Sequence, residues 1–520
     1  MRSLVLFLYS ALSFFAFTLC NPSDLRNPGD TRSQAFRDQL LWQEFIRPRS
    51  ICDMTSFDYA PAYTSVVVKE ALTPVQLLQK TDKSIYVFGV TTFQPEKNLG
   101  SFIGTEDTGI YRNAVLYKFN ETGSVEWSRT LGTATSAGNS LGIIESDSGV
   151  YLAFTASSGI GSPINAFTGS IGNIAVFHIA NDGSILWNTY YGDNAGTNKA
   201  YSIAKLSNGD LIISGESNSS GIPTFPGTIL KLNPSIPQNS AYVMRMKPNG
   251  TASWIHFYGG ASAGYLRNAD RVSVSSNDTI TTFGFDREPL YSGYSQVVQN
   301  HTGTAPRKEY LVTQFDSNGT YLRHTFILTN NGQASPILPL PKESEIPNEM
   351  IVAGVTSAEF QGLEGVRARN YQGSSDQFLI KLNSTLNVSY VTYLGGSNND
   401  QASVYKIFQD TKKEGHFLFS PFLYDPEYGP GFPGSAGYPT LGLVRLDSSG
   451  KIVEYGFRAE KEFNVPFTML NTCDGGMLLS YFLGDSLASP TYAKFRLTKI
   501  RPMIPFYHEY RTGYGIISDK

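Results

Sequence analysis

The 520-residue sequence has few of the residues that usually mark a chemical site. It contains three cysteines and six histidines, and no two histidines stand at metal-ligand spacing. No Gly-x-Ser-x-Gly sequence stands in the strand-to-helix context of a nucleophile elbow, and no glycine-rich phosphate loop precedes a helix. We therefore expect no metal and no cofactor, and a structural role for every histidine: His178, His256, His301, His324, His416 and His508.

The sequence also lacks a charge excess and, beyond its N-terminus, a long apolar run. It has 41 basic and 44 acidic residues, for a formal net charge of -3. A protein that binds nucleic acid by neutralising phosphates needs a basic surface, so we expect no nucleic-acid partner. No later run reaches the roughly 20 apolar residues of a transmembrane helix, so the mature chain is expected to have no span of its own.

The N-terminus carries an export signal. Arg2 precedes an apolar run from Leu4 to Leu19, which is typical of a secretory signal peptide and predicts removal of residues 1–19. Cys20 ends the run before a turn-prone segment, and this resembles a bacterial lipoprotein signal. The resemblance implies acylation of Cys20 and anchoring at the outer membrane or cell surface. Among the three residues before Cys20 only Thr18 fits the usual box, so an ordinary signal and a secreted protein remain the alternative.

Residues 20–62 are expected to form a tether and one short helix. Between Thr31 and Ile46 apolar residues fall at helical spacing beside charged ones, which predicts an amphipathic helix packed on its own domain. The remaining cysteines are Cys52 and Cys473. In an exported protein they would suit either a disulfide that ties this arm to the end of the chain or two separate buried thiols.

The composition that is present favours an all-β protein. Aromatic residues make up 13% of the chain and there are 49 glycines. The stretch from Ile174 to Ser217 consists of four short runs of alternating apolar and polar residues, separated by turn sequences such as Asn-Asp-Gly and Ser-Asn-Gly. This pattern predicts a meander of four strands.

One part of this stretch returns along the chain as a strand, a glycine turn and an aromatic-rich strand. The turn glycines step by 60, 67, 69 and 131 residues, and the last step covers two repeats because the fifth copy has Thr385-Leu386 instead: Gly123, Gly183, Gly250, Gly319 and Gly450. Trp127, Trp187 and Trp254 each stand four residues after such a glycine. We expect these tryptophans to pack between neighbouring sheets rather than to stack on carbohydrate.

A second mark, a polar turn followed by a buried-looking strand, occurs seven times, beginning with the strand after Asp82 and ending with the strand after Asp474. Repeated four-strand units of fixed period predict a seven-bladed β-propeller of antiparallel blades, over residues 63–520. The repeats resemble the SBBP-type bacterial propeller repeat from about Val75 to Ile500. That resemblance implies an extracellular location and supplies no catalytic residue.

The sequence leaves two strands of the ring undetermined: one innermost strand and the outer strand of the last blade. The proline-containing segment from Pro336 to Pro341 interrupts an expected innermost strand. The outer strand of the last blade should come either from the C-terminal tail after Arg501 or from the N-terminal side at Thr64 to Ala71, because an exposed sheet edge invites aggregation.

The connections between the second and third strands of each unit are long. Insertions on one face of a repeat protein commonly form its binding face, and the connection from Leu423 to Pro439 presents Tyr428, Phe432 and Tyr438 as candidate contacts. We expect a monomeric, non-catalytic scaffold that binds a protein or a glycan. The alternatives are a glycan hydrolase or lyase with paired carboxylates at the channel mouth, and a purely structural envelope component.

Overall fold

The computed structural model describes the strands and many of their turns. These strands belong to one compact unit, residues 55–520. The described residues are 57–58, 72–91, 101–103, 113–120, 125–134, 141–168, 172–193, 196–218, 222, 225–231, 240–259, 268–286, 298, 309–327, 338–339, 350–356, 358–360, 362–371, 376–394, 407–409, 417–419, 422–423, 440–458, 463–471, 477–484, 494–500 and 516–517.

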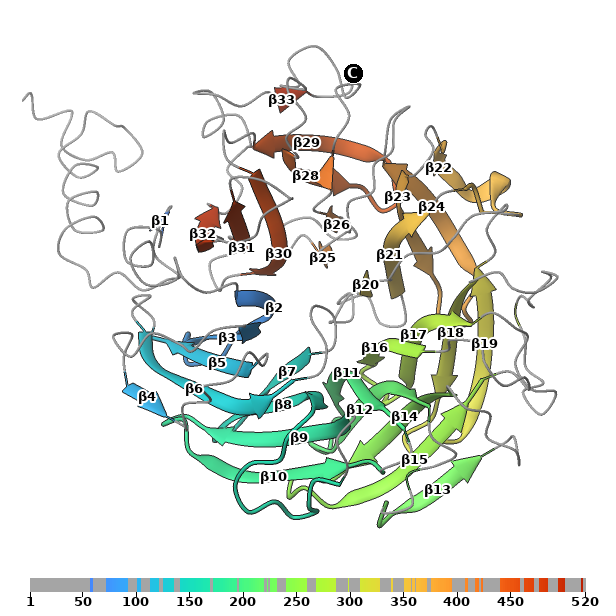
Figure 1. Cartoon of the computed structure of the whole chain (residues 1–520). Coiled ribbons are helices and arrows are strands. Elements are labelled where there is room, and N and C mark those ends of the chain that lie inside the picture. Colours follow the sequence, from blue (N-terminus) through green and yellow to red (C-terminus); the bar gives the residue numbers. More distant parts are fainter. Residues whose placement is uncertain are drawn as a thin grey trace, which may run out of the picture. The chain divides into compact units, whose positions relative to one another are not determined.

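The described strands form seven sheets, each built on a four-strand antiparallel meander (Figure 1). Blade 1 is β2 (Leu72–Gln79), β3 (Ile85–Thr91), β5 (Asn113–Phe119) and β6 (Val125–Thr133). Blade 2 is β7 (Leu141–Ser146), β8 (Gly149–Ala156), β9 (Asn173–Ala180) and β10 (Ile185–Tyr191). Blade 3 is β11 (Asn198–Lys205), β12 (Leu211–Ser217), β14 (Ser240–Met246) and β15 (Ala252–Tyr258).

The later blades follow the same plan. Blade 4 is β16 (Asn268–Val274), β17 (Ile280–Asp286), β18 (Glu309–Phe315) and β19 (Tyr321–Ile327). Blade 5 is β20 (Leu338–Pro339), β21 (Met350–Thr356), β23 (Asp376–Leu382) and β24 (Val388–Leu394). Blade 6 is β25 (Ile407–Gln409), β26 (Phe417–Phe419), β28 (Thr440–Leu446) and β29 (Ile452–Arg458), with β27 (Phe422–Leu423) also pairing β28. Blade 7 is β30 (Phe463–Asn471), β31 (Met477–Gly484), β32 (Lys494–Ile500) and β1 (Phe57–Asp58).

The seven-bladed β-propeller is therefore confirmed, and both sequence marks fall on the strands they predicted. The second mark gives the second strand of every blade, and the first gives the third and fourth strands. One detail was wrong. The four strands from Ile174 to Ser217 are not one meander, because β9 and β10 complete blade 2 whereas β11 and β12 begin blade 3. The repeat seen in this stretch therefore begins at the third strand of one blade and ends at the second strand of the next.

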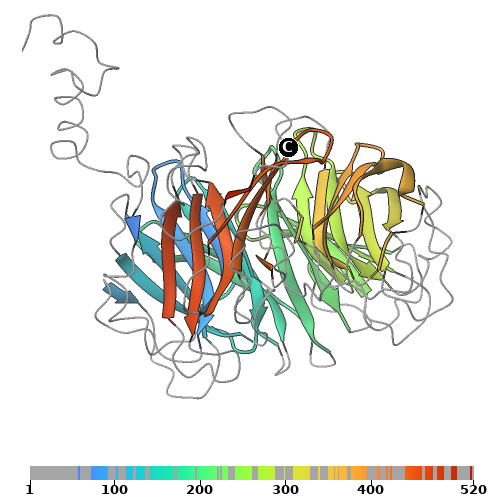
Figure 2. The same cartoon turned by 90° about the horizontal axis from the view of Figure 1, so that it is seen from above.

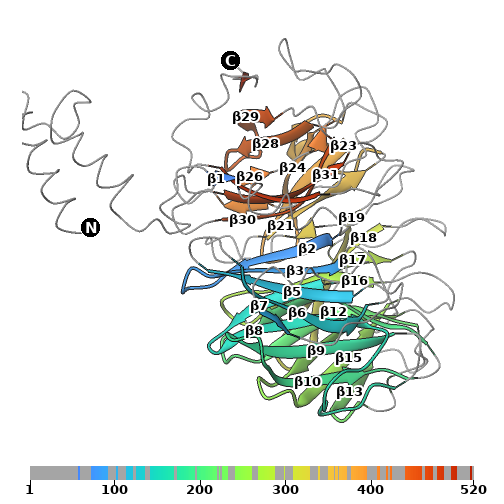
Figure 3. The same ribbon diagram turned by 60° about the vertical axis from the view of Figure 1, so that its left-hand side comes forward.

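The first strand of each blade lies at the inner side of the ring. The inner strands of blades 1 to 5 contact one another in turn, β30 of blade 7 lies beside β2 of blade 1, and β28 of blade 6 contacts β30 (Figures 2 and 3). The inner strand of blade 5 is the two-residue β20, as expected from its prolines.

Blade 7 is completed from the N-terminal side, but by residues other than those expected. Phe57 and Asp58 pair with Lys499 and Thr498 of β32, upstream of the segment from Thr64 and of the boundary at residue 63. The C-terminal tail instead supplies β33 (Ile516–Ile517), which pairs with β29 of blade 6. Both chain ends thus protect outer edges, on adjacent blades.

The long connections protect the outer edges of the other blades. The connection between the second and third strands returns along its own blade and pairs in parallel with the fourth strand, as β4 (Ser101–Ile103), β13 (Thr228–Lys231) and β22 (Arg367–Arg369) do. In blade 2, Ile164 N donates to Asn188 O over 2.8 Å, and in blade 4, Val298 N donates to His324 O over 2.9 Å. These connections thus cover the outer edge of their own blades.

Apolar side chains fill the spaces between blades. Four buried clusters occur in the described residues, and they lie between blades 1 and 2, 2 and 3, 3 and 4, and 4 and 5. Alternate residues of a strand point to opposite faces, so each sheet contributes to two clusters. In the part of the chain that the structure describes, no helix is long and apolar enough to cross a bilayer.

Candidate functional site

The three repeated tryptophans join each blade to the next at the end where the third and fourth strands turn. Trp127 Nε1 donates to Asn181 O over 2.9 Å, Trp187 Nε1 to Pro248 O over 3.0 Å, and Trp254 Nε1 to Ser317 O over 3.3 Å. The three acceptors occupy the same position in the turns of blades 2, 3 and 4. The prediction that these residues pack between sheets is confirmed.

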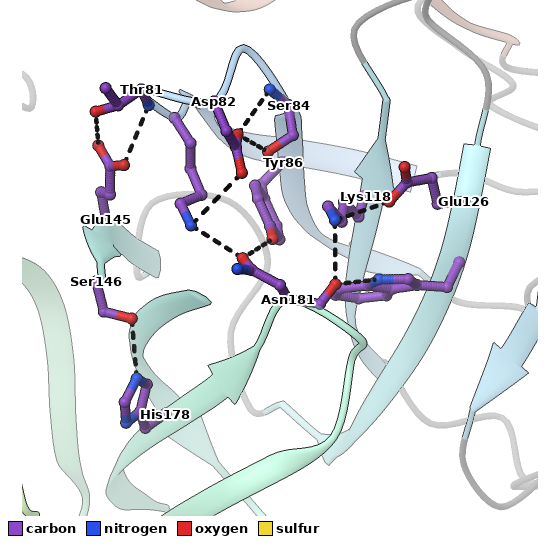
Figure 4. A network of polar contacts seen from close by, with 12 residues as sticks. Thr81, Asp82, Ser84, Tyr86, Lys118, Glu126, Glu145, Ser146, His178 and Asn181 are labelled. Atoms are coloured by element: carbon purple, nitrogen blue, oxygen red, sulfur yellow. Dashed lines mark hydrogen bonds and ion pairs between the residues drawn. The ribbon is translucent and has the colours of Figure 1, made fainter. Parts of the chain in front are cut away.

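Figure 4 shows this contact at the junction of blades 1 and 2. Asn181 lies at its centre, and its side-chain oxygen accepts from Lys80 Nζ over 2.9 Å and from Tyr86 OH over 3.2 Å. Lys118 Nζ donates to the Asn181 carbonyl beside Trp127, over 3.1 Å, and pairs with Glu126 over 2.8 Å. These polar groups hold the two blades together. The side chains drawn bond to one another across the junction, which fits a structural role.

The turn glycines are required by both conformation and space. Gly250 and Gly319 have φ of +84° and +82°. A Cβ on Gly319 would lie 2.8 Å from Leu230 Cδ1 and 2.9 Å from the Trp254 ring. The one described turn with another residue is in blade 5, where Leu386 has φ +65°. The fourth strand of the preceding blade there carries Arg323 in place of tryptophan, so no indole ring stands in the way.

A basic residue five positions before the turn glycine shares this contact in blades 1 and 3, and the sequence analysis did not identify it. Lys118 and Arg245 lie opposite Trp127 and Trp254 on the adjacent strand. Lys118 donates to Asn181 O, and Arg245 donates to Ser317 O over 2.7 Å, alongside the tryptophan. The offsets of -5 and +4 residues from Gly123 and Gly250 were the available signal.

His178 and His256 have partners within the fold. His178 Nε2 lies 2.9 Å from Ser146 Oγ, and its ring stacks 4.2 Å from the Tyr151 ring. His256 Nδ1 lies 2.7 Å from Gly319 O, an acceptor, so it carries the proton. Burial lowers the pKa of both imidazoles. His301, His416 and His508 lie outside the described residues.

The turn aspartates shape their turns. Asp316 Oδ1 accepts from Asn318 N over 2.9 Å and from Thr320 N over 2.8 Å, and Asp182 and Asp447 accept in the same way. Among the described residues no three His, Cys, Asp or Glu side chains are grouped so as to hold a metal ion.

Several predicted site residues fall outside the described part of the chain. These are the lipidation site, the two remaining cysteines and the three aromatic loop contacts: Cys20, Cys52, Cys473, Tyr428, Phe432 and Tyr438. The signal peptide and the short N-terminal helix lie outside it too. All of these therefore stay predictions.

Ionisable side chains gather instead at the junction of blades 3 and 4, at the end where the long connections begin. We call this group the acidic junction: Lys199, Tyr201, Glu216, Asp270, Arg271, Asp286 and Glu309. Lys199 Nζ pairs with Glu216 Oε1, and the Tyr201 hydroxyl bonds to the same carboxylate. Arg271 donates to Tyr201 O over 3.2 Å, from the inner strand of the next blade.

Strand register explains why these side chains meet. Glu216 shares the face of Ile212, which packs towards blade 4, whereas Asp286 shares the face of Ile280, which packs towards blade 3. A bulge at Tyr201 and a second irregularity between Asn268 and Arg271 re-aim the inner strands. Asp286 and Glu309 are direct cross-strand partners and are 0% and 2% exposed.

Neighbouring carboxylates raise the pKa values of two tyrosines in this region. Burial raises the pKa of Tyr201, and the nearby Glu216 and Asp270 carboxylates raise it further. Burial likewise raises the pKa of Tyr258, with Asp286 and Asp270 contributing. The Asp270 carboxylate therefore acts on the pKa of both tyrosines. Within the junction, Asp286 is fully buried and the Lys199 side chain is 31% exposed.

The acidic junction departs from the repeat. At the register of Glu216 the neighbouring blades carry Val90, Thr155 and Phe285, and at the register of Asp286 they carry Ala156 and Ser217. Charged residues in place of small or apolar ones cost stability at a blade interface. Departures of this kind are expected at functional positions.

Comparisons with known proteins assign no family to this chain. No family model and no curated protein matches the chain, so the SBBP-type resemblance stays a prediction. A protein of unknown function from Dyadobacter fermentans is 10% identical, with TM-score 0.36, over 84% of this chain and 97% of that one. An α-L-arabinofuranosidase from Fusarium graminearum is 9% identical, with TM-score 0.38, over 73% and 93%. A puromycin hydrolase is 11% identical, with TM-score 0.42, over 87% and 55%. Such distant likenesses do not bear on the chemistry of the acidic junction.

Proposed function

We propose that this protein is an exported β-propeller that binds a glycan at the acidic junction and does not turn it over. The observation that supports this proposal is the Lys199–Glu216–Tyr201 group, which breaks the repeat and is partly open to solvent. Sugar hydroxyls need donors and acceptors side by side, and an ammonium, a carboxylate and a phenol supply both. The rigid ring holds them in place. This moves the binding site from the predicted loop face to the inner end of one blade junction.

Binding rather than hydrolysis is favoured by the contacts of Glu216. Lys199 and the Tyr201 hydroxyl both engage Glu216. The carboxylate is thus already held by two side chains of the protein, and this fixed set of donors and acceptors suits hydrogen bonding to a ligand.

One observation favours a glycan hydrolase or lyase as a second candidate. Asp286 and Glu309 lie directly opposite each other on adjacent strands, and both are buried. Two neighbouring carboxyl groups, one protonated and one ionised, are the machinery with which glycosidases work. Because both side chains are buried, turnover would require the junction to open.

The test is binding of soluble oligosaccharides, neutral and uronate-containing, to the full chain by isothermal titration calorimetry. Glu216→Gln and Tyr201→Phe should each weaken binding at least tenfold. Glu126→Gln, which removes the ion pair with Lys118 at another junction, is the matched control and should bind like the wild type. Release of reducing ends that Asp286→Asn abolishes would establish the hydrolase instead. If neither Glu216→Gln nor Tyr201→Phe changed the affinity, this site would be excluded.

Export and anchoring form the second part of the proposal. The signal-like run and Cys20 support a lipid anchor. Mass spectrometry of the N-terminal peptide from host membranes should find an acylated Cys20, and Cys20→Ser should release the protein from the membrane fraction. An unmodified N-terminus at Asn21 in the medium would mean a freely secreted protein.

A further inference from the structure

The interior of the junction between blades 3 and 4 contains a row of polar side chains where other blades have apolar ones. Thr282, Thr313 and His324 are in register across β17, β18 and β19. Each shares its face with an apolar residue of the cluster between blades 3 and 4, namely Ile280, Leu311 and Phe326. We call these three residues the polar row. It points towards blade 3.

The equivalent rows show how unusual this is. In blade 3 the row is Ile213, Met244 and Ile255, and in blade 5 it is Val352, Ile380 and Val391. In blade 2 it is Leu152, Phe177 and Asn188. Among the rows of blades 1 to 5, which are all described, blade 4 alone has three polar members. Since buried polar groups without partners cost free energy, the row needs an explanation.

Some atoms of the row have protein partners. Tyr258 of blade 3 donates its hydroxyl hydrogen to Thr282 Oγ1 over 2.7 Å, and Thr282 Oγ1 lies 3.4 Å from Thr313 O. Tyr321 OH lies 2.7 Å from His324 Nδ1. One side of the row is therefore satisfied by hydroxyl groups of both blades.

Two atoms at the centre of the row have no hydrogen-bond partner. They are Thr313 Oγ1 and His324 Nε2, on side chains that are 0% and 1% exposed. Direct cross-strand neighbours have Cβ atoms about 5 Å apart, so one small molecule can reach both atoms. Each atom alone would lose the full desolvation cost of an unmade hydrogen bond.

The repeat also shows how blade 4 differs at these two positions. The positions equivalent to Thr313 carry the larger Tyr117, Phe177, Met244 and Ile380. The positions equivalent to His324 carry Ser128, Asn188, Ile255 and Val391. Blade 4 thus places a short hydroxyl side chain beside an imidazole. Burial lowers the pKa of His324 to about 4, so the imidazole is neutral at pH 7 and offers no charge to an ion. A small neutral molecule that both donates and accepts fits these properties.

We propose that the polar row is a binding site for an ordered internal water molecule, held by Thr313 Oγ1 and His324 Nε2 between blades 3 and 4. A buried water typically makes two to four hydrogen bonds to polar groups that would otherwise lack partners. The water completes a polar seam that runs through Thr282 and Tyr258 towards Asp286. This inference stands independently of glycan binding.

A crystal structure of the full chain at high resolution tests the site directly. We expect density for one water within 3.2 Å of both atoms, and its loss in the Thr313→Val, His324→Leu double variant. An empty, dry gap, or rearranged side chains that pair the two atoms with the protein, would overturn the proposal.

A double-mutant cycle tests it in solution. Thr313→Val and His324→Leu each leave the water with one partner fewer, so each should lower Tm by about 2 °C. The double variant removes the water together with both partners, and its Tm should lie within about 1 °C of the wild type. Tyr321→Phe controls for the loss of the Nδ1 contact. Losses that simply add would contradict a shared occupant, and circular dichroism checks that each variant folds.

Discussion

The junction of blades 1 and 2 and the junction of blades 3 and 4 share one end and differ at the other. At the turn end both have a basic residue and a tryptophan donating to one carbonyl, Asn181 O in the first and Ser317 O in the second. In the middle, the first contains Leu152 and Phe177 of blade 2 and the second contains Thr282 and Thr313 of blade 4.

The difference suggests a division of labour within the repeat. The turn-end contact recurs because every blade must join the next, and its geometry permits little variation. Farther from the turn, a junction retains enough apolar contact to tolerate polar residues, as the cluster between blades 3 and 4 still does. New chemistry is thus expected where the repeat is broken, away from the turn glycines.

The largest expected effect is at a turn glycine. Gly319→Ala should destabilise the protein by about 3–4 kcal/mol, because the left-handed backbone disfavours a Cβ and the Trp254 ring occupies its space. Gly362→Ala is the matched control, since Gly362 has φ +73° with nothing within 4 Å of an added Cβ. It should cost only about 1 kcal/mol, measured by urea unfolding. Equal costs at the two sites would show that the ring contact has no energetic role.

The second prediction concerns acid. The pKa of His324 is about 4 in the folded chain against an ordinary value of 6.5, so the unfolded chain binds more protons between these values. Stability must then fall as pH drops from 6.5 to 4, by about 3 kcal/mol from this residue. The lowered pKa values of His178 and His256 act in the same direction. His324→Asn should flatten the curve of unfolding free energy against pH, and an unchanged slope would contradict the buried neutral imidazole.

A third and smaller effect should follow from removing one indole N–H. Trp254→Phe replaces the buried indole by a smaller phenyl ring and loses the donor to Ser317 O, which Arg245 still engages. We expect a loss of about 2 kcal/mol in denaturant unfolding, from the lost hydrogen bond and the smaller buried ring. Trp127→Phe should cost about the same, because Lys118 also donates to Asn181 O. A much larger loss at only one junction would break the equivalence of the two turn ends.

The fold could be predicted from the sequence because the repeat is marked by features of neighbouring residues. Turn glycines and alternating apolar residues are short-range features, and they located the second, third and fourth strands of the blades. Prediction failed where partners are distant in sequence. Nothing local shows that Phe57 pairs with Lys499, or that a long connection returns to its own outer strand.

The acidic junction was beyond prediction for the same reason. Lys199, Glu216 and Asp270 are separated along the chain, and only the bulges of two inner strands bring them together. The expected loop face rested on connection length alone, which edge protection also explains. Aligning the blades position by position would have singled out Glu216 and Asp286 as charges in uncharged columns, without giving their surroundings.

The last prediction contrasts two ion pairs of different exposure, and the more exposed one should give the smallest effect of all. Glu126, which pairs with Lys118, is 40% exposed, so Glu126→Gln should change the free energy of unfolding by less than about 0.5 kcal/mol. Asp210 and Arg245 form the corresponding pair near the turn end of blade 3, with side chains only 11% and 17% exposed. Asp210→Asn should cost about 2 kcal/mol, because it leaves the guanidinium less compensated in a less hydrated place. Raising the salt concentration should weaken the Lys118 pair and leave the Arg245 pair largely unchanged, as unfolding of both variants at low and high salt would show. If both substitutions were equally mild, the two turn ends would be alike in electrostatics as well as in geometry, and the contrast between the junctions would reside wholly in the polar row and the acidic junction.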